Sequence, residues 1–489
     1  MNNLIVKFDR YFLMYLFTFS LFGFSISAQA ETVKLTPEQA VDLALKNNKI
    51  LESGRWTLKL KEATCKGAIT GFLPKLAGSA SYRRTSGVPG FEFGGDMTSM
   101  DFTSLGLQLS DLADTNVQKT LKILNGVFSG MSTGLEMGSR DNYSIGFQIT
   151  QPIFTGFKII NSFRMAGEAF EMQKMELEKS KQLTAFGALS MYWMAFTLKK
   201  SIKVTKDAEA QLARLKQDQE KLFEQNMLAK HDLFQIRASH AKAKVSVLQV
   251  TRQYNNLKRQ FIDFINLEHD TEVEFITDTE NEIHAELQNL DDYIKWVKNN
   301  RPDLKQNNNT RNILRLSEKL GKSGYFPTIV AVGGYNYAKP NQQVSFENEW
   351  AGSWSIMAMV NWNLFDWGEA YRKGKEAEFQ RKAGESGLES SDRNIFTQAN
   401  NAWESVNESR EEYDAAKEAE TASELSYKAV NLKHEHGMAT TFELLSSHTS
   451  LTSAKLTTLQ AIVKLKLAIE NMKIGGLGTG FGSNRAGAP

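Results

Sequence analysis

Five of the seven histidines lie near two segments that repeat one another, 226–233 and 437–444. These five histidines are His231, His240, His434, His436 and His448. Histidine titrates near neutral pH and is a common metal ligand, so the group could form a pH-sensitive gate or a metal site. His434 and His436 are two residues apart and do not share a helix face, which disfavours joint coordination of a metal. A third interpretation, exposed histidines without a special role, stays open.

Other motifs that resemble catalytic or cofactor-binding sequences do not form an active site. The tripeptide Gly-Lys-Ser at 321–323 resembles the end of a phosphate-binding loop, but Leu316 occupies the place of the required glycine. The tripeptide His-Glu-His at 434–436 lacks the spacing of a zinc protease, and the glycine-rich segment 475–482 follows a helix rather than a strand. No nucleophile and base stand together on a strained turn. We therefore expect no enzymatic activity, no cofactor and no bound metal.

The N-terminus has the features of a secretory signal peptide. Lys7 and Arg10 precede an apolar run at 11–24, and the small residues Ala-Gln-Ala follow at 28–30. This order predicts a signal peptide over residues 1–30 and a mature chain that leaves the cytoplasm. Cys65 is the single cysteine, so no internal disulfide is expected.

Bulk composition excludes two classes of protein. The 489-residue chain has a net charge of +2, which gives no reason to expect a nucleic-acid partner. Hydrophobic residues make up 41% and the mean hydropathy is −0.38, so the chain is not a bundle of membrane helices. After the signal peptide no stretch reaches about 18 consecutive apolar residues. If the mature chain enters a membrane, it must therefore do so as part of a closed β-barrel.

Two long stretches predict very long helices. No proline occurs between Pro152 and Pro302, or between Pro340 and Pro489, and proline breaks helix interiors. Apolar and small residues follow heptad spacing within both stretches. The seams are Phe234, Ala238, Ala241, Val245 and Leu248; Val250, Tyr254, Leu257, Phe261 and Phe264; Ile395, Ala399, Ala402 and Val406; and Ala454, Thr458, Ala461, Leu465, Ala468 and Met472. The first two of these seams, which begin at Phe234 and Val250, are offset from each other. They predict a helix packed on both sides, as in a closed ring of helices, although an ordinary four-helix bundle is the simpler alternative.

Strands with two different faces recur in the chain. The segment Tyr143–Phe154 reappears 211 positions later as Trp354–Phe365, with large apolar residues at alternate positions in both copies. We predict strands at 75–83, 142–154, 328–338 and 352–365. The apolar, outward faces would be Leu76, Ala80 and Tyr82; Tyr143, Ile145, Phe147, Ile149 and Ile153; Ile329, Tyr335 and Tyr337; and Trp354, Ile356, Val360, Trp362 and Leu364. The inward faces would be polar, with Ser79, Ser81, Ser144, Gln148, Thr150, Ser355, Asn361 and Asn363. Apolar-out and polar-in is typical of outer-membrane barrels, and also of a half-buried sheet.

The repeat predicts the organisation of the whole chain. After the signal peptide we expect a first repeat at 31–270, a second at 271–475 and a flexible glycine-rich tail at 476–489. Each repeat would contain a short helix, a long helix, a strand, a loop, a strand and a long helical hairpin. The offset of 253 between Phe72-Leu-Pro and Tyr325-Phe-Pro exceeds the later offset of 211 by 42, which places a long mouth loop between Arg83 and Asn142. Four strands cannot close a barrel around a channel, so several chains must share one.

At this point the sequence resembles the TolC-like outer-membrane efflux proteins, from about residue 33 to 475. The resemblance rests on the order, spacing and duplication of motifs, with Gly437 and the helix after it: Leu35-Thr-Pro-Glu-Gln-Ala-Val-Asp-Leu-Ala-Leu-Lys-Asn-Asn48, Phe72-Leu-Pro74, Gln151-Pro-Ile-Phe-Thr-Gly156 and Asn363-Leu-Phe-Asp-Trp-Gly368. It implies a mainly α-helical fold with a small β-barrel part. Three chains would form a homotrimer with a 12-stranded barrel in the outer membrane and an α-helical tunnel through the periplasm of a Gram-negative bacterium.

The resemblance also implies a function and partners. The protein would be a passive export duct, and a periplasmic adaptor and an inner-membrane pump of the RND or ABC type would dock at the tunnel's inner end. The hairpin tips there would form the periplasmic aperture, with the residues Asn226, His231, Asp232, His434, Gly437 and Glu443. Glu443 and Asp232 match acidic positions of the family, and three Glu443 carboxylates near the axis would favour cations. The alternative is that Glu443 is a solvated charge that complements the helix dipole.

Two other functions remain as alternatives. The first is a periplasmic adaptor, although adaptors have a single helical hairpin flanked by small β-domains and this chain has two hairpins. The second is a structural trimeric coiled-coil protein of the envelope, which would lack paired strands that recur with the helices.

Overall fold

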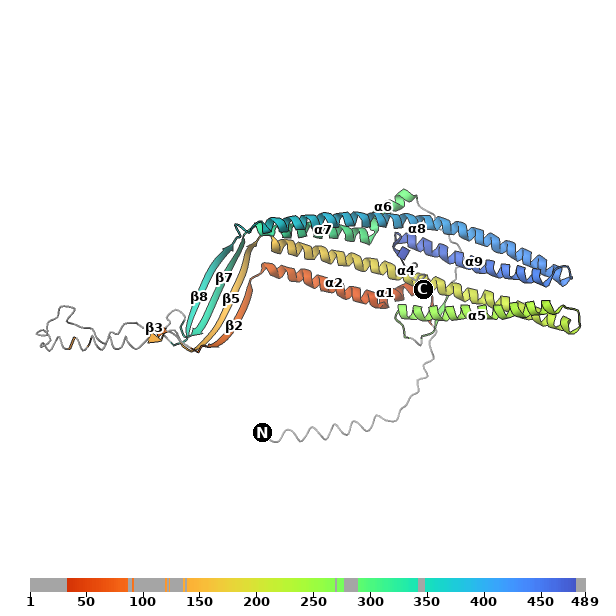
Figure 1. Ribbon diagram of the computed structural model, residues 1–489, viewed down its shortest axis with the longest axis horizontal. Helices are drawn as coiled ribbons and strands as arrows, with labels where there is room; N and C mark the ends of the chain where they lie inside the picture. Colours follow the sequence, from red (N-terminus) through yellow and green to blue (C-terminus); the bar gives the residue numbers. More distant parts are fainter. Residues whose placement is uncertain are drawn as a thin grey trace, which may run out of the picture. The chain divides into compact units, whose positions relative to one another are not determined.

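The structure is a computed structural model that describes residues 33–86, 90–91, 119–120, 123, 135–136, 139–268, 271–276, 289–341 and 348–480. Long helices and one four-stranded sheet account for most of these residues (Figure 1). The elements of the first half are β1 (Val33–Leu35), α1 (Pro37–Asn47), α2 (Lys49–Ala68), the 3-10 helix η1 (Ile69–Phe72), β2 (Lys75–Arg84), β3 (Gly90–Phe91), β4 (Leu135–Glu136), β5 (Asp141–Thr155), α4 (Lys158–Glu224) and α5 (Lys230–Phe264). Those of the second half are β6 (Val273–Phe275), α6 (Leu290–Asn300), α7 (Pro302–Gly321), η5 (Lys322–Tyr325), β7 (Thr328–Lys339), β8 (Ala351–Asn361), α8 (Glu369–Glu435), α9 (Thr441–Lys473) and η6 (Leu477–Gly480).

The elements recur at the spacing that the sequence predicts. Helices α4 and α8 each have 67 residues, and α8 begins and ends 211 positions after α4. The earlier elements α6, α7 and η5 begin 253 positions after α1, α2 and η1. The predicted order of short helix, long helix, strand, strand and long helical hairpin is therefore confirmed for both halves of the chain.

The four predicted strands form one antiparallel sheet in the order β2, β5, β7, β8. Three of them lie within one residue of their predicted bounds. The prediction for the fourth was wrong at its end, because β8 stops at Asn361 instead of residue 365. Asn361 pairs with Thr328, the first residue of β7. Pro327, which has no backbone N–H, precedes Thr328, so residues 362–365 have no partner strand.

The register confirms that the predicted apolar residues share one face of the sheet. Residues directly opposite in a ladder lie on the same face. Rows of opposite residues on this face are Tyr82 with Tyr143; Ala80, Ile145 and Tyr337; Phe147, Tyr335 and Trp354; and Leu76, Ile149, Gly333 and Ile356. Trp362 and Leu364, which we also assigned to this face, lie beyond the end of β8. Ile153, also assigned to this face, has no partner in the ladder, because a register shift between Pro152 and Phe154 places Phe154 opposite Ile329.

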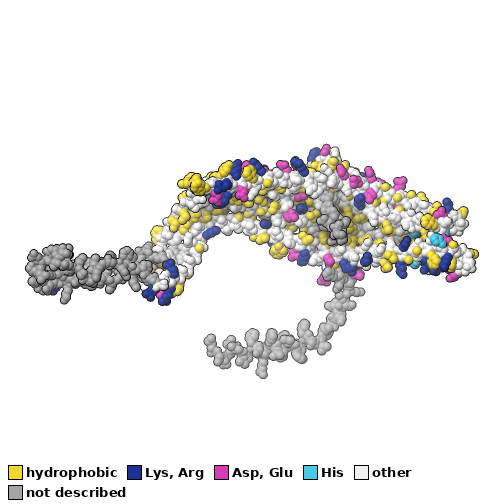
Figure 2. Space-filling model, in the orientation of Figure 1, with side chains coloured by type: hydrophobic (Ala, Val, Ile, Leu, Met, Phe, Trp, Pro, Cys, Tyr) yellow, Lys and Arg dark blue, Asp and Glu magenta, His cyan; other side chains and the backbone are white. Residues whose placement is uncertain are grey.

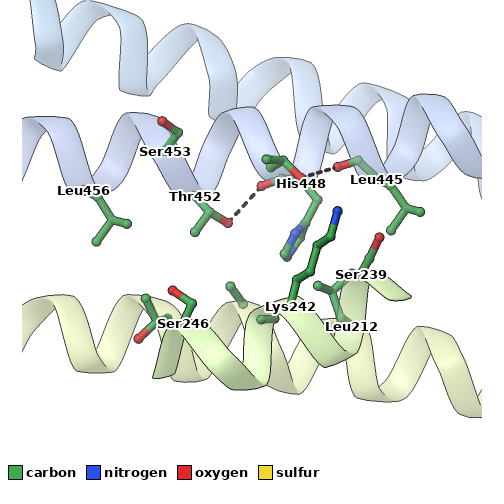
Figure 3. A pocket seen from close by; sticks show the side chains of 13 residues that line it. Leu212, Ser239, Lys242, Ser246, Leu445, His448, Thr452, Ser453 and Leu456 are labelled. Atoms are coloured by element: carbon green, nitrogen blue, oxygen red, sulfur yellow. Dashed lines mark hydrogen bonds between the residues drawn. The ribbon is translucent and has the colours of Figure 1, made fainter. Parts of the chain in front are cut away.

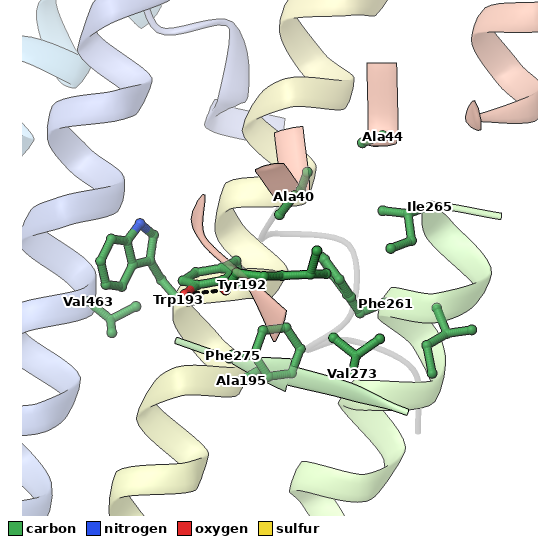
Figure 4. Packing of buried hydrophobic residues seen from close by; sticks show 13 residues of the cluster. Ala40, Ala44, Tyr192, Trp193, Ala195, Phe261, Ile265, Val273, Phe275 and Val463 are labelled. Carbon is green, nitrogen blue, oxygen red and sulfur yellow. Dashed lines mark hydrogen bonds between the residues drawn. The ribbon is translucent and has the colours of Figure 1, made fainter. Parts of the chain in front are cut away.

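One hydrophobic core joins the first strand and helix to the long hairpin α4–α5 (Figure 4). Strand β1 pairs in parallel with β6, Val33 opposite Val273, a contact that the sequence did not predict. Tyr192 of α4 is completely buried, and its hydroxyl hydrogen-bonds with the carbonyl oxygens of Leu35 and Ile276 next to these strands. Burial raises the pKa of Tyr192 to about 12, so the hydroxyl stays protonated as a donor.

The predicted seams on α8 and α9 form buried contacts. Ile395, Ala399, Ala402 and Val406 are each at most 5% exposed. On α9 the buried seam residues are Thr458, Ala461, Leu465 and Ala468, and the hydroxyl of Thr458 donates to the carbonyl oxygen of Ala416 on α8. Small residues on the seams permit this close approach of helices.

The chain divides into two compact units, each of which combines parts of both predicted repeats. The first unit comprises Met1–Lys59, Met172–Asn308 and Leu388–Pro489, and the second comprises Leu60–Glu171 and Asn309–Gly387. The sheet lies wholly in the second unit, and both hairpin turns lie in the first. The division into repeats at residues 270 and 271 stays a prediction, and the compact units follow a different division.

Three further predictions concern the signal peptide, the mouth loop and the C-terminal tail. The signal peptide at 1–30 and most of the mouth loop between Arg83 and Asn142 lie outside the described residues. The tail predicted from residue 476 is packed at its start, because Leu477–Gly480 form η6 and the N–H of Gly478 donates to the Asn471 side chain. Its remainder, 481–489, is outside the described residues. Among the described helices, none has the length and apolar character that crossing a membrane requires.

Candidate functional site: the hairpin tips and the exposed apolar faces

Both long hairpins turn with the same backbone geometry. Asn226 follows α4 with φ 57°, and Gly437 follows α8 with φ 70°. In the first turn the N–H groups of Asn226 and Met227 donate to the carbonyls of Phe223 and Leu222; in the second the N–H groups of Gly437 and Met438 donate to those of His434 and Lys433. Each is a Schellman motif, which requires a left-handed residue at this position and favours glycine or asparagine there. The sequence repeat thus located both turns.

The six residues predicted to line an aperture lie at these two turns. Asn226, His231, Gly437 and Glu443 are exposed, whereas Asp232 and His434 are partly buried. Figure 2 shows histidine side chains near this end of the hairpins. Within the described residues no hydrogen bond or ion pair joins the three predicted residues of the first turn to the three of the second. Further along the helices, His448 of α9 hydrogen-bonds with Gln211 of α4 at 3.1 Å.

Glu443 has a local role at the start of α9. Its carboxylate accepts from the backbone N–H of Thr440 at 2.8 Å, and the Thr440 hydroxyl accepts from the N–H of Glu443 at 3.2 Å. This capping box satisfies two N–H groups at the helix start. The hydrogen bond from the Thr440 backbone is the main reason that the pKa of Glu443 is lowered, so the side chain is ionised at neutral pH. The first hairpin lacks this box, because Ala229 occupies the position of Thr440.

The histidines are distributed along the helices rather than gathered. His240 contacts Glu209 at 2.8 Å, and His231 contacts Gln235 at 2.9 Å. His448 is 5% exposed, and its pKa is lowered by burial and then by Lys455. In the part of the chain that the structure describes, no group of three His, Cys, Asp or Glu side chains could hold a metal ion. The described geometry therefore gives no support to the metal-site interpretation.

One predicted seam of α5 is exposed on the single chain. Phe234 is 51%, Val245 53% and Leu248 64% exposed, and Ala238 and Ala241 between them are also exposed. The offset seam that includes Val250 and Phe261 instead packs within the chain. A continuous apolar stripe at heptad spacing is typical of a helix that packs against another helix.

The sheet of the second unit has two exposed edges and an exposed apolar face. Strands β2 and β8 each have one sheet neighbour within the described residues, and every residue of β2 is exposed. Aromatic rings contact one another at the far end of the apolar face, where Tyr82 lies 5.0 Å from Tyr143 and Tyr337 lies 5.0 Å from Trp350, measured between ring centroids. Aromatic residues at the end of an apolar band are typical of outer-membrane strands.

A second aromatic group lies where the strands meet the helices. Phe157 lies 5.2 Å from both Phe154 and Phe326, and Phe365 lies 4.9 Å from Trp367, between ring centroids. Sequence reasoning assigned the strands but missed this group. The positive φ of Phe157 and Trp367 comes from the turns before α4 and α8. The motifs Thr-Gly-Phe and Asp-Trp-Gly in the sequence could have indicated these turns and the aromatic residues in them.

Comparison with solved structures gives the same fold at low sequence identity. The CmeC outer membrane channel of Campylobacter jejuni matches with a TM-score of 0.73 and 14% identity over 90% of this chain and 86% of that chain. The outer membrane protein VceC of Vibrio cholerae matches with a TM-score of 0.70 and 12% identity over 90% and 96%. The open state of the MtrE outer membrane channel of Neisseria gonorrhoeae matches with a TM-score of 0.64 and 14% identity over 90% and 88%. The comparison with curated protein sequences gives no match.

The family comparison covers most of the chain in two segments. The sequence model described as outer membrane efflux protein matches residues 40–261 and 294–472. This match confirms the predicted class of protein, an efflux duct of the outer membrane, and it favours neither the periplasmic adaptor nor the structural coiled-coil protein. The chain belongs to the outer membrane efflux protein family.

Proposed function

We propose that three copies of this chain form a passive duct that receives cargo from an inner-membrane pump and releases it outside the outer membrane. A periplasmic adaptor and a pump of the RND or ABC type are the proposed partners, and outer-membrane lipid surrounds the sheet. The family is one of channels. No catalytic role is assigned to any residue.

The single observation that best supports the trimer is the pair of unpaired sheet edges. A four-stranded sheet with two long exposed edges leaves a row of N–H and C=O groups without partners. In a membrane such groups must be satisfied, which requires a closed barrel. Pairing β8 of one copy with β2 of the next closes the barrel, and three copies supply twelve strands. The apolar face with its two aromatic groups then faces lipid.

The exposed seam of α5 supports the same assembly in the helical part. Among the described residues of a single copy, the seam from Phe234 to Leu248 is an exposed apolar stripe. In a closed ring of helices every helix has two neighbours, so this stripe would pack against a helix of the adjacent copy. The adaptor and fibre alternatives do not account for the sheet edges and the helical seam together.

The hairpin tips are the proposed inner aperture. Asn226 and Gly437 set the turns, and His231, Asp232, His434 and Glu443 place titratable groups next to them. The ionised Glu443 would contribute three negative charges to the trimer, which favours passage of cations. Its capping box already provides hydrogen bonds for this carboxylate, so the proposed selectivity is additional to a structural role.

The proposal is tested by measuring the mass of the assembled protein and the cell fraction from which it is recovered. We expect the full chain to be recovered from the outer-membrane fraction and to show three times its mature chain mass by native mass spectrometry in detergent. Unheated samples should migrate as a trimer in gel electrophoresis and heated samples as a single chain. Recovery as a soluble periplasmic monomer would contradict the proposal and favour an adaptor.

A further inference from the structure

A cavity lies between three helices near the hairpin tips, entirely within the first compact unit. Its volume is about 440 Å³, and its lining residues come from α4, α5 and α9 (Figure 3). None of the six residues predicted for the aperture lines it. The cavity is therefore a separate feature of the helical part.

The charge of the cavity comes from one lysine. Lys242 is the single charged residue in the lining, which contains no carboxylate. Within the described residues Lys242 has neither an ion pair nor a hydrogen bond. Figure 3 shows its side chain extending from α5 toward α9, with its end beside His448. The pKa of His448 is lowered by burial and by Lys455, so the imidazole is neutral at neutral pH and Lys242 alone sets the charge.

Three hydroxyl groups in the lining are available as donors. The side-chain hydroxyls of Ser239, Ser246 and Ser453 make no hydrogen bond within the described part of the chain. Thr449 and Thr452 differ, because their hydroxyls donate to the carbonyls of Leu445 and His448. A hydroxyl that donates to its own helix cannot donate to a ligand at the same time. The serines and the Lys242 ammonium thus provide donors on both α5 and α9.

Three leucines provide the largest apolar surface of the lining. Leu212 of α4 and Leu445 and Leu456 of α9 line the cavity. In Figure 3 the two leucines of α9 point toward α5. A concave site with apolar walls and a few convergent polar groups is typical of a binding site for a small molecule.

We propose that this cavity binds a small amphiphilic anion, with its charged group at Lys242 and the serine hydroxyls and its hydrocarbon part against the leucines. Charge decides the sign of the ligand, because an anion gains an ion pair and a cation would face Lys242 without a counter-charge. The leucines decide its character, because a fully hydrated inorganic anion would leave them without contacts. The proposal concerns binding by the purified protein and does not depend on export.

The test uses the full trimer in lipid nanodiscs and two probes of equal chain length. Hexane-1-sulfonate is charged at all accessible pH values, and 1-hexanol is its neutral counterpart. Isothermal titration calorimetry, with empty nanodiscs as the reference, should show saturable binding of the sulfonate at one site per chain. The sulfonate should bind about tenfold more tightly than the alcohol, since a hydrogen bond to a charged group contributes roughly this factor or more.

Two variants and one matched control assign the binding to the cavity. Lys242→Gln should weaken sulfonate binding about tenfold or more, and Ser246→Leu should abolish it because leucine fills the space. Lys244→Gln removes a charge from the same helix outside the lining and should change the affinity less than twofold. The proposal is overturned by any of three results: no saturable binding of the sulfonate, equal affinity for the alcohol, or unchanged affinity in Lys242→Gln while each variant remains trimeric.

Discussion

Replacing Arg301 by methionine is expected to destabilise the first compact unit by about 3–5 kcal/mol, the usual cost of removing one partner from a buried charged network. The Arg301 side chain is 1% exposed, and its Nε donates to both carboxylate oxygens of Asp303, at 3.0 and 3.1 Å. Its other nitrogens donate to the carbonyls of Ile395 and Gly475 and to the side chain of Gln398. Methionine would leave these acceptors without donors and the Asp303 carboxylate without its counter-charge. The midpoint of limited proteolysis in a urea series measures the loss.

Arg315→Met is the matched control for this substitution. The Arg315 side chain is 62% exposed, and its Nε lies 3.8 Å from the Glu385 carboxylate. Exposed ion pairs of this kind contribute at most about 1 kcal/mol. We expect its urea midpoint to stay close to that of the unmodified protein. Equal midpoints for the two variants would show that the Arg301 network does not hold α6, α8 and the end of α9 together.

Aspartate at both Val245 and Leu248 is expected to abolish the trimer and leave a folded single chain. Both side chains are more than half exposed on the chain, at 53% and 64%, so their replacement costs the fold of one copy little. In the proposed ring of three copies, the stripe of each copy is buried against the next copy. Six buried carboxylates without partners cannot be accommodated there. Native mass spectrometry should show the mass of one chain, with an unchanged circular dichroism spectrum.

The double variant Gln249→Asp and Gln253→Asp is the control. Both glutamines are exposed on the same helix, they are neutral, and they do not belong to the seam. This variant gains the same charge and should remain trimeric. A trimer that survives aspartates on the seam would show that α5 does not form the contact between copies.

The parts of the fold that the sequence predicted are those with strong periodicity. Heptads on α8 and α9 and alternation on β2, β5, β7 and β8 extend over many residues, so one misjudged position does not change the result. Because the elements recur in both halves of the sequence, each one was predicted from two separate segments. The turn residues Asn226 and Gly437 were identified because the left-handed conformation restricts residue type.

The parts that were missed depend on contacts between distant short segments. Strands β1 and β6 have three residues each and pair across more than 200 positions, too short for a periodic signal. The roles of Tyr192 and Arg301 follow from which backbone carbonyls happen to lie beside them. The end of β8 depended on where its partner β7 begins. The cavity at Lys242 is lined by three helices from distant parts of the sequence, which spacing along one helix cannot reveal.

The central claim, a duct that acts with partners in the envelope, is tested most directly by crosslinking in intact cells. In a Cys65→Ser background, cysteines at Lys230 and Met438 place one reactive group at each hairpin tip, and Met438 is 71% exposed. After treatment with a bifunctional thiol reagent, the crosslinked products are identified by mass spectrometry. We expect capture of a periplasmic adaptor and an inner-membrane pump. Capture of only its own chains, at normal expression and in the outer membrane, would contradict it and indicate a free-standing pore or a structural trimer.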